Sequence, residues 1–471
     1  MKNKKIITFL VVLVFLVGGI FLINNIYQNK NKINKTKRRK QNNLAIMIKE
    51  DGATEYTKSS TKDIPKGNYT LNYEKSYCKN NGVIGNYDNT LGKVSFSFVG
   101  TDSCYLYFDY EISGYMTILN NNGGKDTIEA KGTPDLNKIA NTNEGMYAAQ
   151  DDLGTSYYFR GAVDNNWLQY GEYTTDMYNC NYGTLSETET GNSCTKIASK
   201  GDKMYWRIIR INGDGSLRLI YSGVTQPNEE TKINMTVGTS LGESEYNSYA
   251  INAEEVGYMY TIGQQQGIST DNVIKIFLDN FYINYTNLNS TESKVTDAIF
   301  CNDRTASTSG DNPYTASEYT TLTSWNSTGI EYYYGAYGRN FDAILSDLRC
   351  PSTIDKFTVN TSIGNGALKY PVGLITSDEV NFAGSIESVS NSSYFLCSSE
   401  NFWTLSPSTN YNVYMIYDDG QLNDGSDNGW DLTRPNSVRP VISLSSSVKL
   451  SGDGTWNNVY TVSWDLLVNM G

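Results

Sequence analysis

The chain has 471 residues, 39% hydrophobic and 13% aromatic, which is enough to bury the cores of two or three domains. Residues 1–43 contain ten Lys or Arg and no acid, which leaves 28 basic against 50 acidic residues in the rest, a net charge of −22 that repels nucleic-acid phosphates. The absence of histidine excludes Ser-His-Asp and Cys-His catalysis and zinc sites with histidine ligands. We therefore expect no nucleic-acid partner, and any catalysis would have to use carboxylates, tyrosines, lysines or a lone cysteine.

The first segment in chain order predicts a membrane anchor. Residues 6–23 are apolar or glycine apart from Thr8, and the run reaches Ile26 if two asparagines are allowed, close to the ~20 residues of a membrane-spanning helix. A cleaved signal peptide is the alternative, but the run is long for one and no small-residue cleavage pattern follows it. We expect an uncleaved single-pass helix within 6–26, followed up to residue 43 by a basic juxtamembrane segment that can contact anionic headgroups.

Charge and cysteine content disagree about the side of the membrane on which the body lies. More Lys and Arg follow the apolar run than precede it, so the positive-inside rule places the body in the cytoplasm. The cysteines favour the other side, because six of the seven fall into pairs that suit disulfides, which form in oxidising compartments. The expected disulfides are Cys78–Cys104, Cys180–Cys194 and Cys301–Cys350. We predict a cell-membrane protein with an extracytoplasmic body, in which Cys397 is a free, buried thiol rather than a nucleophile.

Residues 44–112 predict a small β-rich domain. Alternate positions are apolar in 94–98 and again in 104–108, on either side of a turn at 100–102, so we expect a hairpin with one buried face. Residues 113–145 are rich in Asn, Gly, Lys and Thr, which is typical of a linker, here with one strand at most.

Residues 146–471 predict a larger domain of strands and few helices. Two strands are expected within 156–171, on either side of a turn at 164–166, and a hairpin over 205–221 around an Asn-Gly-Asp-Gly turn. Three further strands are expected to meet late in the chain, at 402–405, 413–417 and 438–444.

Two helices are predicted in the same domain. Apolar residues recur at helical spacing over 271–281, with Ser269 or Thr270 as the N-cap. A second helix is predicted to begin after Thr376, because Thr376 and Glu379 have capping-box spacing and Gly384 supplies the end.

Six motifs carry a resemblance to a known family. They are GTSYYFRGAVDNNW, YWRIIRINGDGSLRLIYSG, IFCNDR, LKYPVGLITSDEVNFAG, NFWTLSPS and SVRPVISLSSSVKLSGDGT. Together, over roughly residues 145–462, they resemble a surface-protein domain of Gram-positive bacteria that is distantly similar to FISUMP-like and formylglycine-generating-enzyme-like modules. The resemblance implies an α+β chain with a C-type-lectin-like domain at 146–471, in which Trp403, Arg439 and Pro440 are core positions.

The sequence departs from the functional motifs of these relatives. The Glu-Pro-Asn and Trp-Asn-Asp motifs of calcium-dependent lectins are absent, and Cys397 stands alone where the formylglycine-generating enzymes have a copper-binding cysteine pair. Neither activity is therefore implied for this chain.

One acidic loop, residues 418–436, is the candidate ligand site. It carries Asp424, Asp427, Trp430 and Asp431, whose carboxylates can accept hydrogen bonds from sugar hydroxyls and whose indole can stack on a ring. Residues 424–429 match part of a calcium-binding EF-hand loop, but its twelfth position is Pro435 instead of Glu, so a solvated loop is the simpler interpretation. We expect no cofactor, with calcium as the alternative.

These observations favour a membrane-anchored surface protein that binds a glycan or a protein ligand without catalysis. One alternative is an enzyme on a formylglycine-generating-enzyme-like scaffold that uses carboxylates or Cys397. Another is a structural component of the cell envelope.

Overall fold

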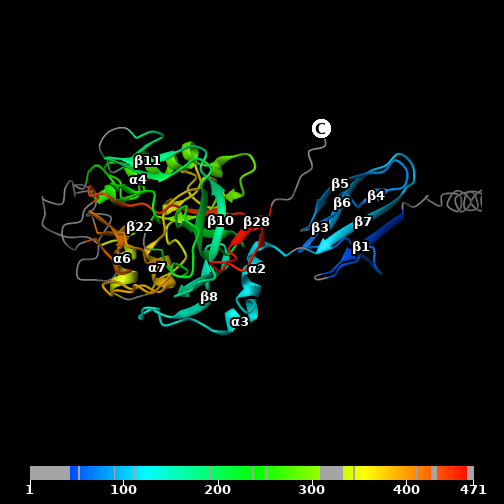
Figure 1. Ribbon diagram of the computed structural model, residues 1–471, viewed down its shortest axis with the longest axis horizontal. Coiled ribbons are helices and arrows are strands. Elements are labelled where there is room, and N and C mark those ends of the chain that lie inside the picture. The colour runs from blue at the N-terminus through cyan, green and yellow to red at the C-terminus, as the bar shows by residue number, and fades with distance from the viewer. Residues whose placement is uncertain are drawn as a thin grey trace, which may run out of the picture. The chain divides into compact units, whose positions relative to one another are not determined.

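The structure is a computed structural model (Figure 1) that describes residues 43–50, 53–89, 91–110, 112–181, 183–189, 193–235, 238–249, 253–307, 333–342, 345–409, 411–425 and 432–463. The chain divides into two compact units, residues 1–112 and residues 113–471. In the described part of the chain, no helix combines the length and the hydropathy needed to cross a bilayer. The predicted anchor at residues 6–26 lies outside the described residues, so it stays a prediction.

The first unit is a five-stranded sheet with a separate two-stranded hairpin. Its strands are β1 (Asn43–Lys49), β2 (Thr57–Lys58), β3 (Tyr69–Leu71), β4 (Tyr77–Cys78), β5 (Val83–Asp88), β6 (Lys93–Ser97) and β7 (Ser103–Tyr110). The long strand β7 pairs in parallel with β1 and antiparallel with β3 and β4 (Figure 1). Alternate residues of β7 reach a small core that consists of Ile46, Leu71, Leu106 and Phe108.

The strands predicted at 94–98 and 104–108 exist as β6 and β7, but the predicted hairpin between them is wrong. β6 pairs with β5, whereas β7 pairs with β1, β3 and β4. The reason lies in β1, which supplies Ile46 to the same core as Leu106 and pairs with β7 in parallel. A parallel pairing between segments distant in sequence leaves no turn signal for sequence analysis to find.

The second unit contains a mixed sheet of nine strands, in the order β19, β26, β15, β14, β10, β28 and β27, with β9 paired to β14 and to β8. These strands are β8 (Asn143–Asp151), β9 (Gly154–Gly161), β10 (Trp167–Glu172), β14 (Lys203–Ile211), β15 (Leu217–Tyr221), β19 (Val295–Thr296), β26 (Val441–Leu444), β27 (Lys449–Ser451) and β28 (Tyr460–Ser463). The predicted hairpin over 205–221 is confirmed as β14 and β15, which pair antiparallel. The turn between them closes with the Asn212 N–H donating to the Ser216 carbonyl at 2.8 Å.

Two smaller sheets complete the β structure around the later strands. A five-stranded sheet has the order β16, β25, β22, β23 and β24, and a three-stranded sheet has the order β12, β11 and β13. Their strands are β11 (Met177–Cys180), β12 (Thr184–Ser186), β13 (Cys194–Ala198), β16 (Glu243–Ser244), β22 (Phe402–Thr409), β23 (Asn412–Ile416), β24 (Leu422–Asn423) and β25 (Asn436–Ser437). Two-stranded pairs are β17 (Met259–Tyr260) with β18 (Thr270–Asp271), and β20 (Phe300–Cys301) with β21 (Lys356–Phe357).

The expectation that three late strands meet in one sheet is right for two of them. Residues 402–405 and 413–417 pair as β22 and β23, but the third segment contributes β26 to the nine-stranded sheet, next to β15. All four residues of β26 are buried, and so are all five of β15, so each strand needs a place inside a large covered sheet.

The helices of this unit are short. They are α2 (Gly114–Asn121), α3 (Lys125–Ala130), α4 (Val273–Asn280), α6 (Gly335–Tyr337) and α7 (Ser377–Ala383), with further helical turns η1 (Ala253–Val256), η2 (Phe281–Tyr285), η3 (Asn287–Asn289), η5 (Gly338–Asp342) and η6 (Thr353–Asp355). With strands in mixed sheets and few helices, the unit is α+β, as expected.

Residues 113–145, predicted as a linker, instead belong to the second unit. The helices α2 and α3 bury Ile118, Leu119 and Ile128 in its core, and they lie beside β28 and β8 (Figure 1). Part of the Asn and Gly content lies where the two short helices end, at Asn122 and Gly123 after α2 and at Gly132 after the Lys131 C-cap of α3.

The two predicted helices exist, one of them with a different cap. α7 has the predicted capping box of Thr376 and Glu379 and ends at Gly384, whose φ of 119° suits glycine. α4 begins two residues later than expected, at Val273, because Asn272 and not Ser269 or Thr270 accepts the hydrogen bond from the first helical N–H.

The three predicted disulfides are confirmed, and Cys397 is a free, buried cysteine. The predicted core positions Trp403, Arg439 and Pro440 are all buried. The Arg439 side chain donates to the carbonyls of Tyr221 and Leu396 at 3.0 and 2.9 Å, so backbone oxygens satisfy this buried cation.

Candidate functional site

Three acidic side chains converge on one hollow of the second unit, which we call the acidic groove. Glu243 lies in β16, Glu400 lies two residues before β22, and Asp418 lies two residues after β23. The groove has a volume of about 760 Å³, within the range of small-molecule sites. Beside the three acids, its lining consists of Asn side chains and Ser and Thr hydroxyls, with Pro435, Gly242 and the Cys194 half of a disulfide.

Strand pairing fixes the walls of the acidic groove. β16 pairs antiparallel with β25, which sets Glu243 opposite Ser437. Ser437 also donates through its N–H to the Asn401 carbonyl at 3.0 Å and through its hydroxyl to Glu400 at 3.1 Å. The Asn401 side chain in turn accepts from the Asp418 N–H at 2.8 Å. The groove is therefore formed by ordered backbone before any ligand arrives.

The opposite wall comes from the three-stranded sheet. The buried Asn179 of β11 donates its amide to the carbonyls of Leu241 and Glu243, at 3.1 and 2.9 Å, and so ties this sheet to β16. The disulfide Cys180–Cys194 joins β11 to β13, and its Cys194 lines the groove. The predicted disulfide Cys180–Cys194 therefore stabilises one wall of the candidate site.

The acidic groove is negative in its electrostatics. The lining residues that the structure describes include no Lys or Arg. Burial raises the pKa of Glu243, and the nearby carboxylate of Glu400 raises it further because two like charges oppose each other's ionisation.

Asn436 provides a buried donor in the groove that has no acceptor among the described residues. It lines the groove from β25 and is only 3% exposed, yet its amide nitrogen has no hydrogen-bond partner. A buried amide donor without a partner costs stability, and the cost is recovered when a ligand oxygen accepts from it.

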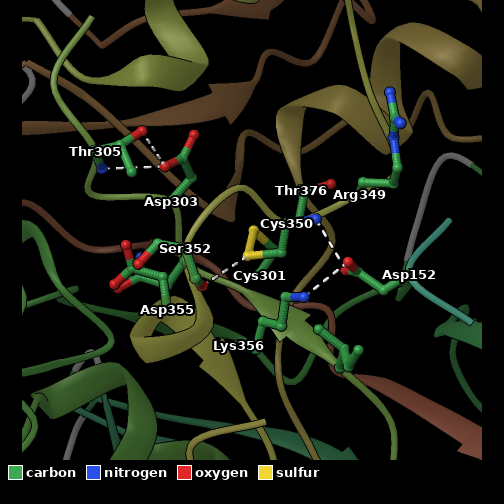
Figure 2. The surroundings of a disulfide bond; sticks show 12 residues. Asp152, Cys301, Asp303, Thr305, Arg349, Cys350, Ser352, Asp355, Lys356 and Thr376 are labelled. Atoms are coloured by element: carbon green, nitrogen blue, oxygen red, sulfur yellow. Dashed lines mark hydrogen bonds and ion pairs between the residues drawn. A yellow bond between two sulfur atoms is a disulfide. The ribbon is translucent and has the colours of Figure 1, made fainter. Parts of the chain in front are cut away.

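A second polar hollow, which we call the ion-pair cleft, lies near the disulfide Cys301–Cys350. Its cavity is only about 30 Å³, roughly the volume of one water molecule. Figure 2 shows Asp152 at this place, where it accepts from Lys356 Nζ at 2.8 Å and from the Cys350 N–H at 2.9 Å. The cleft is therefore narrow and its acids are already engaged.

Arginines neutralise the deeper acids of the ion-pair cleft. Arg210 contacts Asp151 at 2.7 Å and Glu379 at 2.9 Å, and Arg218 also pairs with Glu379. Burial would raise the pKa of Glu379, but the two arginines outweigh burial and hold this pKa below its usual value. A third arginine, Arg339, bridges Asp303 and Asp378 at 2.6 and 2.9 Å. This arrangement stabilises the charges of acids on buried strands and α7 by direct contact with arginines.

Cys397 lies next to the acidic groove but does not line it. It is 5% exposed, and its sulfur lies 3.6 Å from the Asp418 carbonyl. Burial, followed by the charge of Asp419, raises the pKa of the thiol to about 11.

We therefore expect Cys397 to resist alkylation. At pH 8 the native protein should react with iodoacetamide at this residue at least about tenfold more slowly than free cysteine, since almost all of the thiol stays protonated. Mass spectrometry of tryptic peptides measures the rate, and the same reaction in urea provides the control in which the thiol is exposed. Native labelling as fast as in urea would show a reactive site.

Of the four ligand-binding residues predicted in the acidic loop, the structure describes only Asp424. Asp424 is only 8% exposed, and its N–H donates to Glu387 Oε1 at 3.1 Å, so it lies inside the unit rather than on an exposed loop. Asp427, Trp430 and Asp431 lie outside the described residues, and so does most of the calcium-like segment. The two ends of the predicted loop, Asp418 and Asn436, do line the acidic groove.

Sequence analysis missed Glu243 and Glu400, which lie 157 positions apart and carry no motif. The sequence signal for Glu400 is its position two residues before the strand predicted at 402–405. In the parts of the chain that the structure describes, no group of three or more His, Cys, Asp or Glu side chains is arranged to hold a metal ion. Comparison with protein-family models, with curated proteins and with solved structures finds no match for this chain.

Proposed function

We propose that this chain is a membrane-anchored, extracytoplasmic surface protein whose second unit binds a glycan in the acidic groove without catalysis. The observation that carries the proposal is the groove itself, about 760 Å³ in volume and lined by carboxylates, amides and hydroxyls on paired strands. Sugar hydroxyls donate and accept hydrogen bonds, so they match a lining in which carboxylates accept and amides and hydroxyls do both.

The anchoring and the fold rest on sequence arguments. The apolar run at 6–26 supports a single-pass anchor, and the three disulfides support an oxidising compartment for the body. The resemblance over residues 145–462 supports a C-type-lectin-like fold for the second unit, and its α+β composition is compatible with that fold. Recognition by segments that link rigid strands is the general pattern in which binding residues are found.

An enzyme on the same scaffold is the competing proposal. Its candidate residues are the acids of the ion-pair cleft and Cys397. The described acids Asp151, Asp303 and Glu379 each contact an arginine, and the Cys397 thiol is buried and protonated, so the geometry favours binding.

The test compares the wild type with the variant E243Q/E400Q on a glycan array. We expect the full chain, purified in detergent, to retain one or more glycans and the double variant to lose about tenfold or more in affinity, because two charged acceptors become neutral. The matched control is E230Q/E292Q, which removes two exposed acids that do not line the groove and causes the same change in net charge.

Two results would contradict the proposal. One is that no glycan is retained by the wild type while a protein or peptide ligand is. The other is that both double variants weaken glycan binding equally, which would show that overall charge and not the groove determines it.

A further inference from the structure

We infer that the acidic groove selects glycans that carry a protonated amine next to a hydroxyl, as in an amino sugar, over neutral glycans. This inference rests on the proposed function and adds the class of ligand. It follows from three features of the groove: acids that form no ion pair with the described residues, repulsion between two of these acids, and a buried donor without an acceptor.

The first feature is that no described cation forms an ion pair with the acids of the groove. None of Glu243, Glu400 and Asp418 forms an ion pair with another described residue. This differs from the ion-pair cleft of the same unit, where each deep acid contacts an arginine. The buried Arg439 interacts with Glu400 through space, but no described cation contacts the three acids, so an ammonium group can form charge-assisted hydrogen bonds with their carboxylates.

The second feature is repulsion between two of the acids. The charge of Glu400 adds to burial in raising the pKa of Glu243, which means that the pair ionises together only at a cost. A bound cation offsets this repulsion, whereas a neutral sugar hydroxyl does not. The other strands that line the groove, β11, β13 and β25, add no titratable side chain there, because Cys194 is in a disulfide.

The third feature is the amide nitrogen of Asn436. It is buried, lines the groove and has no acceptor. The ligand should therefore present an oxygen close to its cation. In a 2-amino sugar, the amine and a hydroxyl stand on adjacent carbons, so one residue can reach the carboxylates and this amide together.

The lining favours an amino sugar over a basic peptide. A lysine or arginine side chain gains part of its binding energy by packing its aliphatic stem on apolar surface. Apart from Pro435 and backbone atoms, the groove offers Asn, Ser, Thr and acidic side chains instead. The hydroxyl groups of a sugar ring can form more hydrogen bonds with these polar side chains than an aliphatic stem can.

The experiment compares two tetrasaccharides that differ only in their amines. Isothermal titration at pH 6, with the full chain in detergent, measures the affinity for a glucosamine tetramer and for its N-acetylated form. At this pH, most amines of the first are protonated and ordinary carboxylates are ionised. We expect the free-amine tetramer to bind at least about tenfold more tightly, since acetylation removes the charge but keeps the ring hydroxyls.

Variants assign the preference to the groove. E243Q/E400Q should abolish the difference between the two tetramers, whereas E230Q/E292Q, with the same net charge, should keep it. N436A should weaken the free-amine tetramer about fivefold by removing one donor. Tryptophan fluorescence during unfolding shows whether N436A is folded. If it is not, the comparison of E243Q/E400Q with E230Q/E292Q still tests whether the amine preference depends on the groove.

The outcomes separate this inference from the proposed function. Equal affinity for the two tetramers, or tighter binding of the acetylated one, overturns the amine preference and leaves glycan binding in place. Tighter binding of tetralysine, or binding of calcium chloride in competition with the amine, also overturns it. If neither tetramer binds, the amine preference is wrong and the glycan array alone decides the proposed function.

Discussion

Replacing Glu379 with Gln is expected to destabilise the second unit by about 3–5 kcal/mol, the cost of breaking a buried ion pair by removing one partner. Glu379 is 3% exposed and contacts both Arg210 and Arg218. Arg210 keeps Asp151 as a partner in the variant, but Arg218, which is 1% exposed, loses its only carboxylate within contact distance among the described residues. A buried cation without compensation is therefore the main cause of the loss.

Chemical denaturation followed by tryptophan fluorescence measures this loss cleanly. All seven tryptophans lie within residues 113–471, so the signal reports on the second unit and is silent about the first. Two controls separate the contributions. Asp176→Asn breaks an exposed pair with Lys196 and should leave the denaturation midpoint almost unchanged. Thr376→Ala removes the cap hydrogen bond to the Glu379 N–H and should cost about 1 kcal/mol.

The effect of Glu379→Gln should also depend on pH. The folded protein holds the pKa of Glu379 below its usual value of 4.5, so the ionised side chain contributes stability above that value. As the pH falls through the lowered pKa, the wild type loses this contribution and the difference from the variant shrinks. A loss of less than about 1 kcal/mol at pH 7 would show that the two arginines are solvated or paired elsewhere in solution.

Local signals predicted much of the secondary structure. The hairpin over 205–221 and the helix after Thr376 are encoded within a few residues, by a glycine-containing turn and by a capping box, and both are present. The disulfides were predictable for a similar reason, because two of the three join cysteines close in sequence.

Pairings over long distances were not predictable. β7 joins β1 and not its sequence neighbour β6, and β26 joins β15 across more than 200 residues. Such pairings depend on which apolar faces can be buried together, and the sequence of one segment does not identify its partner strand. The linker prediction at 113–145 failed in the same way, since the apolar residues of α2 and α3 acquire a partner only in the folded unit.

The candidate site also combines residues that local sequence could predict with residues that depend on strand pairing. Asp418 and Asn436 were within reach of sequence analysis, because they end a long polar loop between predicted strands. Glu243 was not, because it reaches the groove only through the pairing of β16 with β25. Strand pairing, and not a local sequence motif, therefore brings the lining residues of the groove together. For this reason no catalytic or metal-binding pattern in the sequence predicted the groove.

Removing the disulfide Cys78–Cys104 by the double change C78A/C104A is expected to unfold the first unit while leaving the second intact. The unit has only four fully buried apolar side chains in its core, which is little for an independent domain. The bridge joins residues separated by 26 positions, and closing a loop of this size contributes about 3–3.5 kcal/mol by limiting the unfolded chain.

The fold around this disulfide offers no substitute for it. The Asp102 carboxylate accepts backbone hydrogen bonds from Asn80, Gly82 and Ser103 beside the bridge, but these bonds exist only in the folded state and do not restrict the unfolded chain. Hydrogen exchange of the full chain, read by mass spectrometry, should show loss of protection in peptides from 43–110 and unchanged protection in 203–221. The control C180A/C194A removes a bridge of 14 positions in the larger unit and should loosen β11 and β13 alone. Retained protection of β1 and β7 in C78A/C104A would show that the small core suffices by itself, because the strands that the bridge joins would then be held by packing and hydrogen bonds.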